Sequence, residues 1–547
     1  MTRADTAYDV AVVGAGVSGA YAAFRLQQQQ IGARRPKRIA LFNYDNRIGG
    51  RLLTRTMPGM PHVHAELGGM RFIPGNQFLT TGLIDLLQLP VRDFPMGNPN
   101  PAIGSNDNFM YLRGQNLLVS DLTDPSKVPY NLSWFERGQT PDALTSYMMN
   151  LFVPNAASLT LSEWFNVEVL GKPLYRYGLW ELFYMALSSE GFEFVQDAGG
   201  YDSNVANANA VATLPPHHSA TATYQTLVGG YDLLPKSLVR QFERWGGTVC
   251  LNHRLASFGR TPGRGATGRY RLNFRRTATR GFRTRDLPSA GPSAGDDQIV
   301  HADRIVLALP RRALELIDNE WLSRDAAGAA NVASVLIQPA FKLFLGYPYP
   351  WWRELGLVAG RSITDMPIRQ TYYFGTEGEQ PGANPENLNS LMMVSYNDVE
   401  VVPFWKGFER DPPFEGYRPR FVPRGRTPVP PAQFDATRGM VEMAQRLVRE
   451  MHGQKTLPDP YAALYHDWSG DPYGGGWHKW KPGVRFDRLM KTMRCPVPDE
   501  AIHVCGEAYS NYQGWVEGAL QTAELMLEEH CGLSRPDWLP ADYDLGP

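Results

Sequence analysis

The chain contains 547 residues, of which 43% are hydrophobic and 20% are charged, and its formal net charge is −1 at pH 7. These proportions are those of a globular protein of about two to four domains. Because the charges balance, no basic surplus indicates binding to nucleic acid or to an anionic membrane. No apolar run is long enough to cross a bilayer, so we predict no nucleic acid and no membrane as partners. Because the N-terminus lacks a charged and then apolar leader, we expect a soluble cytoplasmic protein, with a processed precursor as the alternative.

The first predicted element is a short buried parallel strand at residues 10–13, followed by a glycine-rich turn and a helix. Gly14 permits the tight turn, Gly16 lets a pyrophosphate approach the backbone, and Gly19 lets the helix pack closely on the strand. Such spacing alone also fits a plain turn, but the order of strand, turn and helix favours dinucleotide binding. Phosphates would lie at the helix N-terminus, where free N–H groups favour negative charge, against Gly16, Val17 and Ser18.

The second predicted strand, residues 38–42, ends where an acidic residue usually binds the adenosine ribose. This chain has Asn43 at that position, with Tyr44 and Asp45 beside it. The acidic signature is absent, but the amide oxygen of an asparagine can still accept a ribose hydroxyl. We therefore predict that Asn43 and Tyr44 contact the cofactor.

Residues 46–51, Asn-Arg-Ile-Gly-Gly-Arg, follow directly. The paired glycines Gly49 and Gly50 expose backbone N–H groups, and Arg51 brings a charge-assisted fork to a phosphate. The segment resembles the second phosphate-contacting segment of the FAD-dependent amine oxidases, the family that contains monoamine oxidase and L-amino acid oxidase. The resemblance implies FAD as the cofactor. A flexible loop is the alternative, which the close coupling to the first motif disfavours.

Residues 65–74, Ala-Glu-Leu-Gly-Gly-Met-Arg-Phe-Ile-Pro, resemble the substrate-side loop of L-amino acid oxidases. The resemblance implies that Arg71 binds the substrate carboxylate and that Gly68, Gly69 and Met70 lie against the flavin. A guanidinium suits this task because it meets a carboxylate with two parallel hydrogen bonds. The alternative is a surface arginine in a turn, but an arginine inside an apolar loop needs an anionic partner.

Residues 140–212 have a helical pattern, with capping-box spacing at Thr160 and Glu163. This segment resembles the helical domain that covers the substrate entrance in L-amino acid oxidases. The predicted strand at residues 248–255 resembles the one whose backbone contacts adenine, which implies that Leu255 makes that contact.

In the predicted strand at residues 341–345, Lys342 is the one charge among apolar residues. A buried ammonium is costly unless it is paired or bound to water, and its pKa falls readily. In the flavin amine oxidases a lysine on such a strand holds a water near flavin N5, so the resemblance implies a catalytic role for Lys342. The alternative is a lysine on the open face of an edge strand.

The apolar strand at residues 391–396 ends at Tyr396. Tyr396 resembles the tyrosine that gives the substrate carboxylate a second hydrogen bond in L-amino acid oxidases. The resemblance implies a catalytic, substrate-binding role for Tyr396. A core tyrosine is the alternative.

Covalent monoamine oxidases carry a cysteine about where Trp477 lies in this chain. The absence of that cysteine implies non-covalent FAD, and the presence of Trp477 implies an aromatic wall of the substrate pocket. Residues 503–520 give the most specific match to the family. There Glu507 would take a ribityl hydroxyl. A helix would begin at Gly514, Trp515 and Val516. Its positive end would face the flavin and stabilise the anionic reduced form of the flavin.

These matches follow the order of the family from about residue 8 to the last helix, and the chain is identified as a member of the flavin amine oxidases. The resemblance implies a mixed α/β fold with a Rossmann-like FAD-binding domain of the monoamine oxidase type, a mixed-sheet substrate domain and a helical domain. The FAD-binding domain would comprise residues 1–60, 225–334 and 490–534, the substrate domain 61–125 and 335–489, and the helical domain 126–224.

The resemblance implies an L-amino acid oxidase, in which an L-amino acid, molecular oxygen and water give the 2-oxo acid, ammonia and hydrogen peroxide, and we expect a homodimer. One alternative is an amine or polyamine oxidase, which Arg71 and Tyr396 disfavour because an amine offers that pair nothing to bind. The other is a flavin monooxygenase that gives an amide, which the sequence does not distinguish.

The side chain of the substrate is predicted to be large and aromatic or apolar, because Trp477, Tyr373 and Trp515 suggest an aromatic wall. A basic side chain, that of arginine or lysine, is the alternative. Aromatic faces also hold cations, and Asp202 or Glu517 would reach in.

The four cysteines form no C-x-x-C pair and no His/Cys ligand cluster along the sequence, so we predict no metal site. We expect reduced thiols that serve as small buried hydrophobes, and a bridge between Cys495 and Cys505 is the disfavoured alternative.

Overall fold

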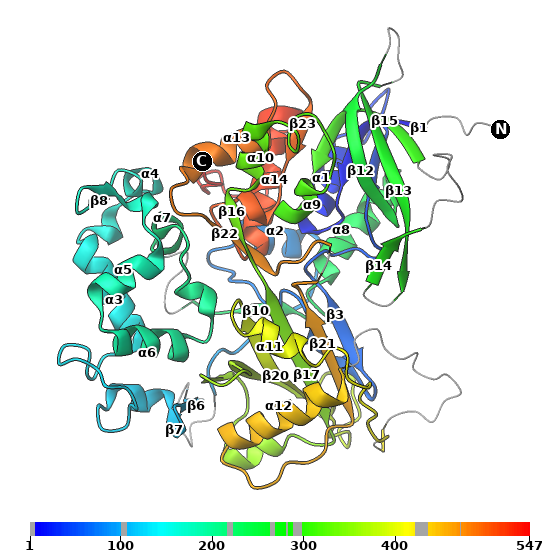
Figure 1. The fold of residues 1–547 in the computed structure, drawn as a ribbon. Helices are drawn as coiled ribbons and strands as arrows, with labels where there is room; N and C mark the ends of the chain where they lie inside the picture. Colours follow the sequence, from blue (N-terminus) through cyan, green and yellow to red (C-terminus); the bar gives the residue numbers. More distant parts are fainter. Residues whose placement is uncertain are drawn as a thin grey trace.

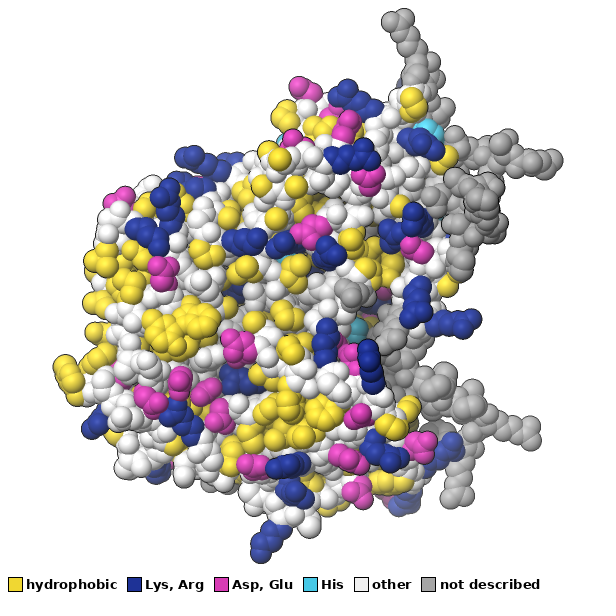
Figure 2. All heavy atoms as spheres, in the orientation of Figure 1, with side chains coloured by type: hydrophobic (Ala, Val, Ile, Leu, Met, Phe, Trp, Pro, Cys, Tyr) yellow, Lys and Arg dark blue, Asp and Glu magenta, His cyan; other side chains and the backbone are white. Residues whose placement is uncertain are grey.

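The computed structural model describes residues 6–99, 107–215, 222–262, 268–280, 283–287, 298–418, 420–421, 436–470 and 472–547. Within these ranges, no helix combines the length and apolar character that crossing a membrane requires. Figure 1 shows two large sheets and a separate group of helices. On the face in Figure 2, basic and acidic side chains are interspersed among the described residues, in keeping with the net charge.

The first sheet has the strand order β11-β2-β1-β15-β13-β12, with β14 paired to β13 and β23 paired to β15. Its strands come from distant parts of the chain: β1 (Thr6–Val13), β2 (Ile39–Phe42), β11 (Thr248–Cys250), β12 (His253–Arg260), β13 (Tyr270–Arg280), β14 (Arg283–Asp286), β15 (Gln298–Leu307) and β23 (Ile502–Val504). The pairs β1–β15, β1–β2, β11–β2 and β15–β23 are parallel. The residues that follow these parallel strands therefore meet at one edge of the sheet, among them Gly14, Asn43, Ala308 and Cys505.

The predicted strand at residues 248–255 is divided in the structure. β11 pairs with β2 in parallel, whereas β12 pairs with β13 in the antiparallel direction. Asn252 lies between them in the left-handed region, with φ of 57°. A short polar residue tolerates this conformation, so the chain can change partner strands there.

The helices α1 (Val17–Gln28), α8 (Leu233–Arg244) and α14 (Val516–Cys531) pack together against the first sheet (Figure 1). The N-termini of α1 and α14 follow the sheet edge at which the parallel strands end. Shorter helices lie around them, namely α2 (Phe78–Leu86), α9 (Arg311–Glu315), α10 (Ala326–Val332) and α13 (Phe486–Arg494).

The second sheet has the order β21-β17-β20-β19-β18-β6-β7. Its strands are β6 (Phe109–Leu112), β7 (Gln115–Leu118), β17 (Ala340–Tyr347), β18 (Arg361–Thr364), β19 (Gln370–Thr376), β20 (Ser390–Asp398) and β21 (Ala462–Asp467). The helices α11 (Val402–Lys406) and α12 (Arg438–Met451) cover one face. All eight residues of β17 are buried between β21 and β20, so the alternative that Lys342 lies on an open edge strand is wrong.

Small two-stranded sheets lie outside the two large ones. They pair β3 (Thr54–Met57) with β4 (Met60–Glu66), β5 (Val91–Asp93) with β10 (Gln225–Leu227), β8 (Glu168–Val169) with β9 (Lys172–Pro173), and β16 (Val335–Gln338) with β22 (Trp477–Trp480).

The group of helices at the left of Figure 1 contains α3 (Pro141–Phe152), α4 (Leu161–Trp164), α5 (Leu179–Ala186), α6 (Ser189–Gly199) and α7 (Ala210–Thr213). The predicted capping box is present at the start of α4, where Thr160 N donates to Glu163 Oε2 at 2.8 Å and Glu163 N donates to Thr160 Oγ1 at 3.4 Å. The three-domain division stays a prediction; the strands of the two large sheets fall inside the ranges assigned to the FAD-binding and substrate domains.

Candidate active site

A cavity of about 330 Å³ extends from the edge of the first sheet to strands β17 and β20 of the second. Most residues singled out from the sequence line it, although they come from segments far apart in the chain. They are Gly14, Gly16, Val17, Ser18, Asn43, Tyr44, Gly50, Arg51, Gly68, Gly69, Arg71, Leu255, Lys342, Tyr396, Trp477, Glu507, Gly514, Trp515 and Val516. Gly19 and Met70 are not among the lining residues.

The three motif glycines meet different constraints. At Gly14, φ is 105° and an added Cβ would lie 2.4 Å from the Ala308 carbonyl oxygen; at Gly19 it would lie 1.8 Å from the Gly14 oxygen. Both glycines are therefore required by the packing of the protein itself. At Gly16, the nearest atom to an added Cβ is the Gly50 Cα at 3.8 Å, an ordinary contact. The protein's own packing does not require Gly16, which leaves room at the N-terminus of α1.

The amide of Asn43 is used inside the protein. Its Oδ1 accepts from Ala15 N at 2.9 Å, and its Nδ2 donates to Asp45 Oδ1 at 2.6 Å and to the Arg47 carbonyl at 2.8 Å. Asn43 thus holds the loops after β1 and β2 together at the cavity wall, and its contact with a ribose stays a prediction. Beside it, the Tyr44 hydroxyl donates to the Thr284 carbonyl.

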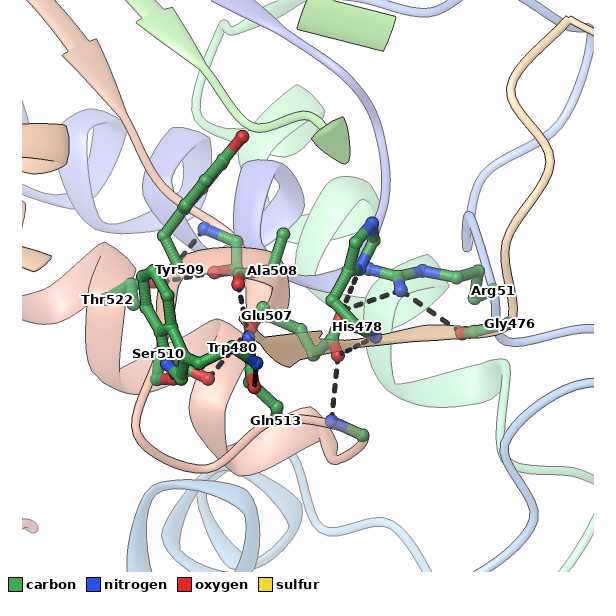
Figure 3. Close-up of polar contacts among 12 residues, drawn as sticks. Arg51, Gly476, His478, Trp480, Glu507, Ala508, Tyr509, Ser510, Gln513 and Thr522 are labelled. Carbon is green, nitrogen blue, oxygen red and sulfur yellow. Dashed lines mark hydrogen bonds and ion pairs between the residues drawn. The ribbon is translucent and has the colours of Figure 1, made fainter. Parts of the chain in front are cut away.

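Glu507 is a buried carboxylate that ties three segments together (Figure 3). Its Oε2 accepts from Arg51 Nη1 at 2.6 Å and is 3.0 Å from His478 Nδ1; its Oε1 accepts from His478 N at 2.9 Å and Gly514 N at 2.8 Å. Burial raises the pKa of Glu507, but Arg51, His478 and the N–H donors outweigh it and hold that pKa well below its usual range. Glu507 is therefore ionised and fixes the loop before α14.

Arg51 shares its charge between Glu507 and the Gly476 carbonyl, to which Nη1 donates at 3.1 Å (Figure 3). It still lines the cavity, and its side chain is 29% exposed. Arg51 therefore has a fixed position from which it can face an anion.

Lys342 points from β17 to the loop that follows β4. Its Nζ donates to the carbonyl oxygens of Glu66 at 3.0 Å and Gly68 at 2.6 Å and lies 3.4 Å from Met70 Sδ. Burial lowers the pKa of Lys342 to about 7, with Glu66 raising it and Arg71 lowering it. The ammonium and the neutral amine are thus both available near neutral pH.

Arg71 lies among aromatic rings. Its Nη1 donates to the Tyr372 hydroxyl at 3.2 Å, and its Cζ lies 5.1 Å from the Tyr224 ring centroid and 5.6 Å from that of Phe94. Burial lowers the pKa of Arg71, but the phenols of Tyr372, Tyr201 and Tyr224 raise it by more, so the cation is retained.

The buried Nε of Arg71 has no partner among the described residues, and none of their carboxylates forms an ion pair with its guanidinium. A buried donor without a partner is costly, and a carboxylate entering the cavity would supply one. The guanidinium of Arg71 could therefore bind an anion that enters the cavity.

The prediction that Tyr373 belongs to the aromatic wall is wrong, because Tyr373 is not among the residues that line the cavity. Its hydroxyl bonds Ser362 at 2.8 Å and His452 at 2.7 Å, and its ring belongs to the core beneath α12. Successive side chains of a strand point to opposite faces, so Tyr372 faces Arg71 instead. Burial raises the pKa of Tyr372, but Arg71 and Arg361 outweigh it and lower that pKa below its usual value.

The aromatic wall itself is present. Tyr396, Trp477 and Trp515 line the cavity, and Lys342 Nζ lies 4.4 Å from the Tyr396 ring centroid. The Tyr201 ring meets that of Tyr396 edge to face at a centroid distance of 5.2 Å, and the Trp515 ring stacks with Tyr224 at 6.5 Å.

The two acids that would have received a basic substrate lie outside this wall. Glu517 is fully buried and accepts from Leu79 N, Thr80 N and the Tyr543 hydroxyl. Asp202 forms an ion pair with Arg369 at 3.4 Å. Neither acid is among the residues that line the cavity, so the prediction that Asp202 or Glu517 reaches a basic side chain of the substrate is wrong.

The four cysteines are free, and the structure brings Cys495, His503 and His530 within 4.8 Å of one another, a grouping that their spacing in the sequence conceals. The guanidinium of Arg304 already lies there, with its Nη1 3.1 Å from His503 Nε2 and 3.0 Å from Cys531 Sγ. A resident cation opposes a second one, so we assign no metal to this group.

Sequence reasoning missed Tyr201, Tyr224 and Glu66. Glu66 is buried beside Lys342, accepts from Thr54 Oγ1 at 2.8 Å and Tyr231 N at 2.8 Å, and its pKa is raised to about 7 by burial. A buried acid within an apolar loop was a signal that the sequence offered. The two tyrosines carried no such signal.

Comparison with known proteins identifies one family and several relatives along most of this chain. The profile of the flavin containing amine oxidoreductase family matches residues 17–525. Aplysianin-A of Aplysia kurodai is 29% identical, over 96% of this chain and 91% of its own, and achacin of Lissachatina fulica is 26% identical, over 95% and 93%. The L-amino-acid oxidase of Mus musculus is 24% identical, over 95% of this chain and 70% of its own.

Among solved structures, a triple mutant of putrescine oxidase has a TM-score of 0.64 at 17% identity, covering 96% of this chain and 99% of that chain. The wild type bound to putrescine has a TM-score of 0.62 at 16% identity, with the same coverage. These similarities concern the fold, and with the family match they confirm the predicted fold class.

Proposed function

Because this chain belongs to the flavin containing amine oxidoreductase family and is thus a flavin-dependent oxidoreductase acting on CH–NH₂ groups, we propose that it is an L-amino acid oxidase. The products are the 2-oxo acid, ammonia and hydrogen peroxide. One observation carries the proposal: Arg71 lines the cavity with a buried Nε that lacks a partner among the described residues. An α-carboxylate satisfies this guanidinium, whereas a simple amine does not.

We propose FAD, bound non-covalently, as the cofactor. The open space at Gly16, the N-terminus of α1, the fixed charge of Arg51 and the N-terminus of α14 fit an elongated dinucleotide. When bound, the flavin accepts two electrons from the substrate and passes them to oxygen. No cysteine is among the described residues that line the cavity, so denaturation should leave the flavin in solution and the precipitated chain colourless.

Gly16→Ala is expected to weaken flavin binding while leaving the fold intact. The new Cβ has only an ordinary 3.8 Å contact inside the protein and φ is −72°, but it fills space that the phosphates need. We expect a loss of roughly tenfold to a hundredfold in flavin affinity, as for overpacking of a tight site. Flavin titration and the melting temperature of the apoprotein measure the two effects separately.

Gly14→Ala is the matched control, because its strained φ and its 2.4 Å approach to Ala308 O should lower the melting temperature itself. Unchanged flavin affinity in Gly16→Ala would contradict the assignment of the phosphate site.

The residues around the cavity would divide the work on the substrate. Arg71 and Tyr396 would hold the carboxylate and fix the orientation of Cα, which is a positioning effect. Lys342, whose pKa is lowered to about 7, would hold or release a proton at Nζ. The surrounding rings of Trp477 and Trp515 would exclude water and favour a large aromatic or apolar side chain.

The test of the function is peroxide release over the L- and D-amino acids and the matching amines, with analysis of the carbon product. The proposal predicts turnover of L-amino acids, with aromatic or large apolar ones preferred, and a 2-oxo acid product. An amide product would identify a monooxygenase, and turnover of amines alone would identify an amine oxidase.

A further inference from the structure

Residues 200–203 follow α6 and run from the group of helices α3 to α7, here called the helical part, to the wall of the cavity. This segment contains Tyr201, whose ring meets two lining residues edge to face: Tyr396 at a centroid distance of 5.2 Å and 88°, and Trp477 at 6.3 Å and 84°. Its phenol also interacts electrostatically with that of Tyr372, which accepts a hydrogen bond from Arg71. Tyr201 therefore contacts two rings of the cavity wall, those of Tyr396 and Trp477.

Two buried side chains of the second sheet hold this segment on either side of Tyr201. Before it, Gln370 Nε2 of β19 donates to the Gly200 carbonyl at 3.0 Å. After it, the Asp398 carboxylate at the end of β20 accepts from Asp202 N at 2.8 Å and from Ser203 N at 3.1 Å. Gln370 and Asp398 are both 0% exposed, so neither hydrogen bond competes with water.

The same clamp reaches the anion-binding group. Gln370 Oε1 accepts from the Tyr372 hydroxyl at 3.1 Å and from Arg361 Nη1 at 3.0 Å, so one amide connects the Gly200 backbone to the residue that bonds Arg71. Asp398 lies two residues after Tyr396 on the same strand. The position of Tyr201 is therefore fixed by the strands that carry the cavity wall, and not by α6 alone.

We propose that Tyr201, clamped by Gln370 and Asp398, is a positioning residue that fixes the Tyr396 and Trp477 rings against the substrate. The inference rests on the proposed function and adds to it a residue from the helical part. Through this contact the helical part orients the aromatic wall, and we expect a change at Asp398 to act on substrate binding through Tyr201.

The test measures the binding of phenylpropanoate, the analogue of phenylalanine without its amino group, to flavin-loaded protein by tryptophan fluorescence. Tyr201→Ala is expected to weaken binding and lower kcat/KM for phenylalanine by about tenfold to a hundredfold, the scale of a small misplacement. Tyr201→Phe keeps the ring and should restore most of the loss. Asp398→Asn offers one acceptor to two N–H groups and should have a weaker effect in the same direction.

The double variant Asp398→Asn/Tyr201→Ala should bind no more weakly than Tyr201→Ala alone, because both changes act through one ring. Additive losses would overturn the inference. So would a Tyr201→Phe variant as weak as Tyr201→Ala, or a Tyr201→Ala variant that equals wild type.

Glu136→Gln is the matched control. Glu136 is also a fully buried carboxylate that accepts backbone N–H groups, from Ser133 and Ser188, but it lies at the far end of α6. It should lower the melting temperature without changing phenylpropanoate binding. If it weakens binding as much as Asp398→Asn does, the effect is general loosening of the helical part and the inference is wrong.

Failure of the proposed function has a different signature. If wild type oxidises phenethylamine and not phenylalanine, the carboxylate assignment fails, and the same variants are compared on the amine. The Tyr396 and Trp477 rings face either substrate, so the expected order of the variants is unchanged.

Discussion

Arg71→Ala is expected to lower kcat/KM for an L-amino acid by about two to three orders of magnitude. The reason is the loss of a desolvated charge pair, which costs about 3 to 4 kcal/mol on truncation of one partner, at about 1.4 kcal/mol per factor of ten. In the free protein the guanidinium has one hydrogen bond, to Tyr372, and a buried Nε without a partner among the described residues. The measurement is kcat/KM for phenylalanine and phenethylamine on wild type and variant.

Turnover of the amine should fall far less, because that substrate never used the guanidinium. Arg71→Lys should not fully restore the amino acid rate. An ammonium lacks the planar fork of a guanidinium and cannot give a carboxylate two parallel hydrogen bonds. Equal losses on amine and amino acid would mean that Arg71 maintains the fold or the flavin site. The amino acid oxidase proposal would then lose its main support.

Lys342→Met is expected to keep the flavin bound and to slow turnover by about a hundredfold, the usual scale of a lost proton-transfer group. Burial lowers the pKa of Lys342 to about 7, so the amine is protonated below this pH and neutral above it. If the neutral amine accepts a proton during turnover, the wild-type rate rises as the pH increases through about 7. In Lys342→Met this rise should be absent. Stopped-flow rates of flavin reduction and reoxidation at several pH values measure it.

Lys479→Met is the matched control for this variant. Burial also lowers the pKa of Lys479, and Glu507 and Asp398 oppose that change, but Lys479 is not among the residues that line the cavity. It should retain the pH dependence of wild type. A Lys342→Met variant with unchanged rates in both half-reactions would reduce Lys342 to a structural residue that holds the Glu66 and Gly68 carbonyls.

The sequence by itself determined the parts of the site that local sterics control. The glycine turn after β1 could be read because only glycine tolerates a φ of 105° at Gly14 and the close approach at Gly19. The buried strands could be read because apolar runs without polar interruption have few other uses. Lys342 stood out for the same reason: one charge in an apolar strand needs a special environment, which the carbonyl oxygens of Glu66 and Gly68 supply.

The tertiary structure alone decided which neighbouring side chain faces the cavity and what each charged group already binds. Tyr372 and Tyr373 are adjacent and chemically alike, and only the packing of α12 on one face of the sheet turns Tyr373 away from Arg71. Glu517 appeared free along the chain, yet folding brings Leu79, Thr80 and Tyr543 onto its carboxylate. Tyr201 had no local signal at all. Its position results from hydrogen bonds to Gln370 and Asp398, residues about 170 to 200 positions away, and such long-range pairings leave no periodicity in the sequence.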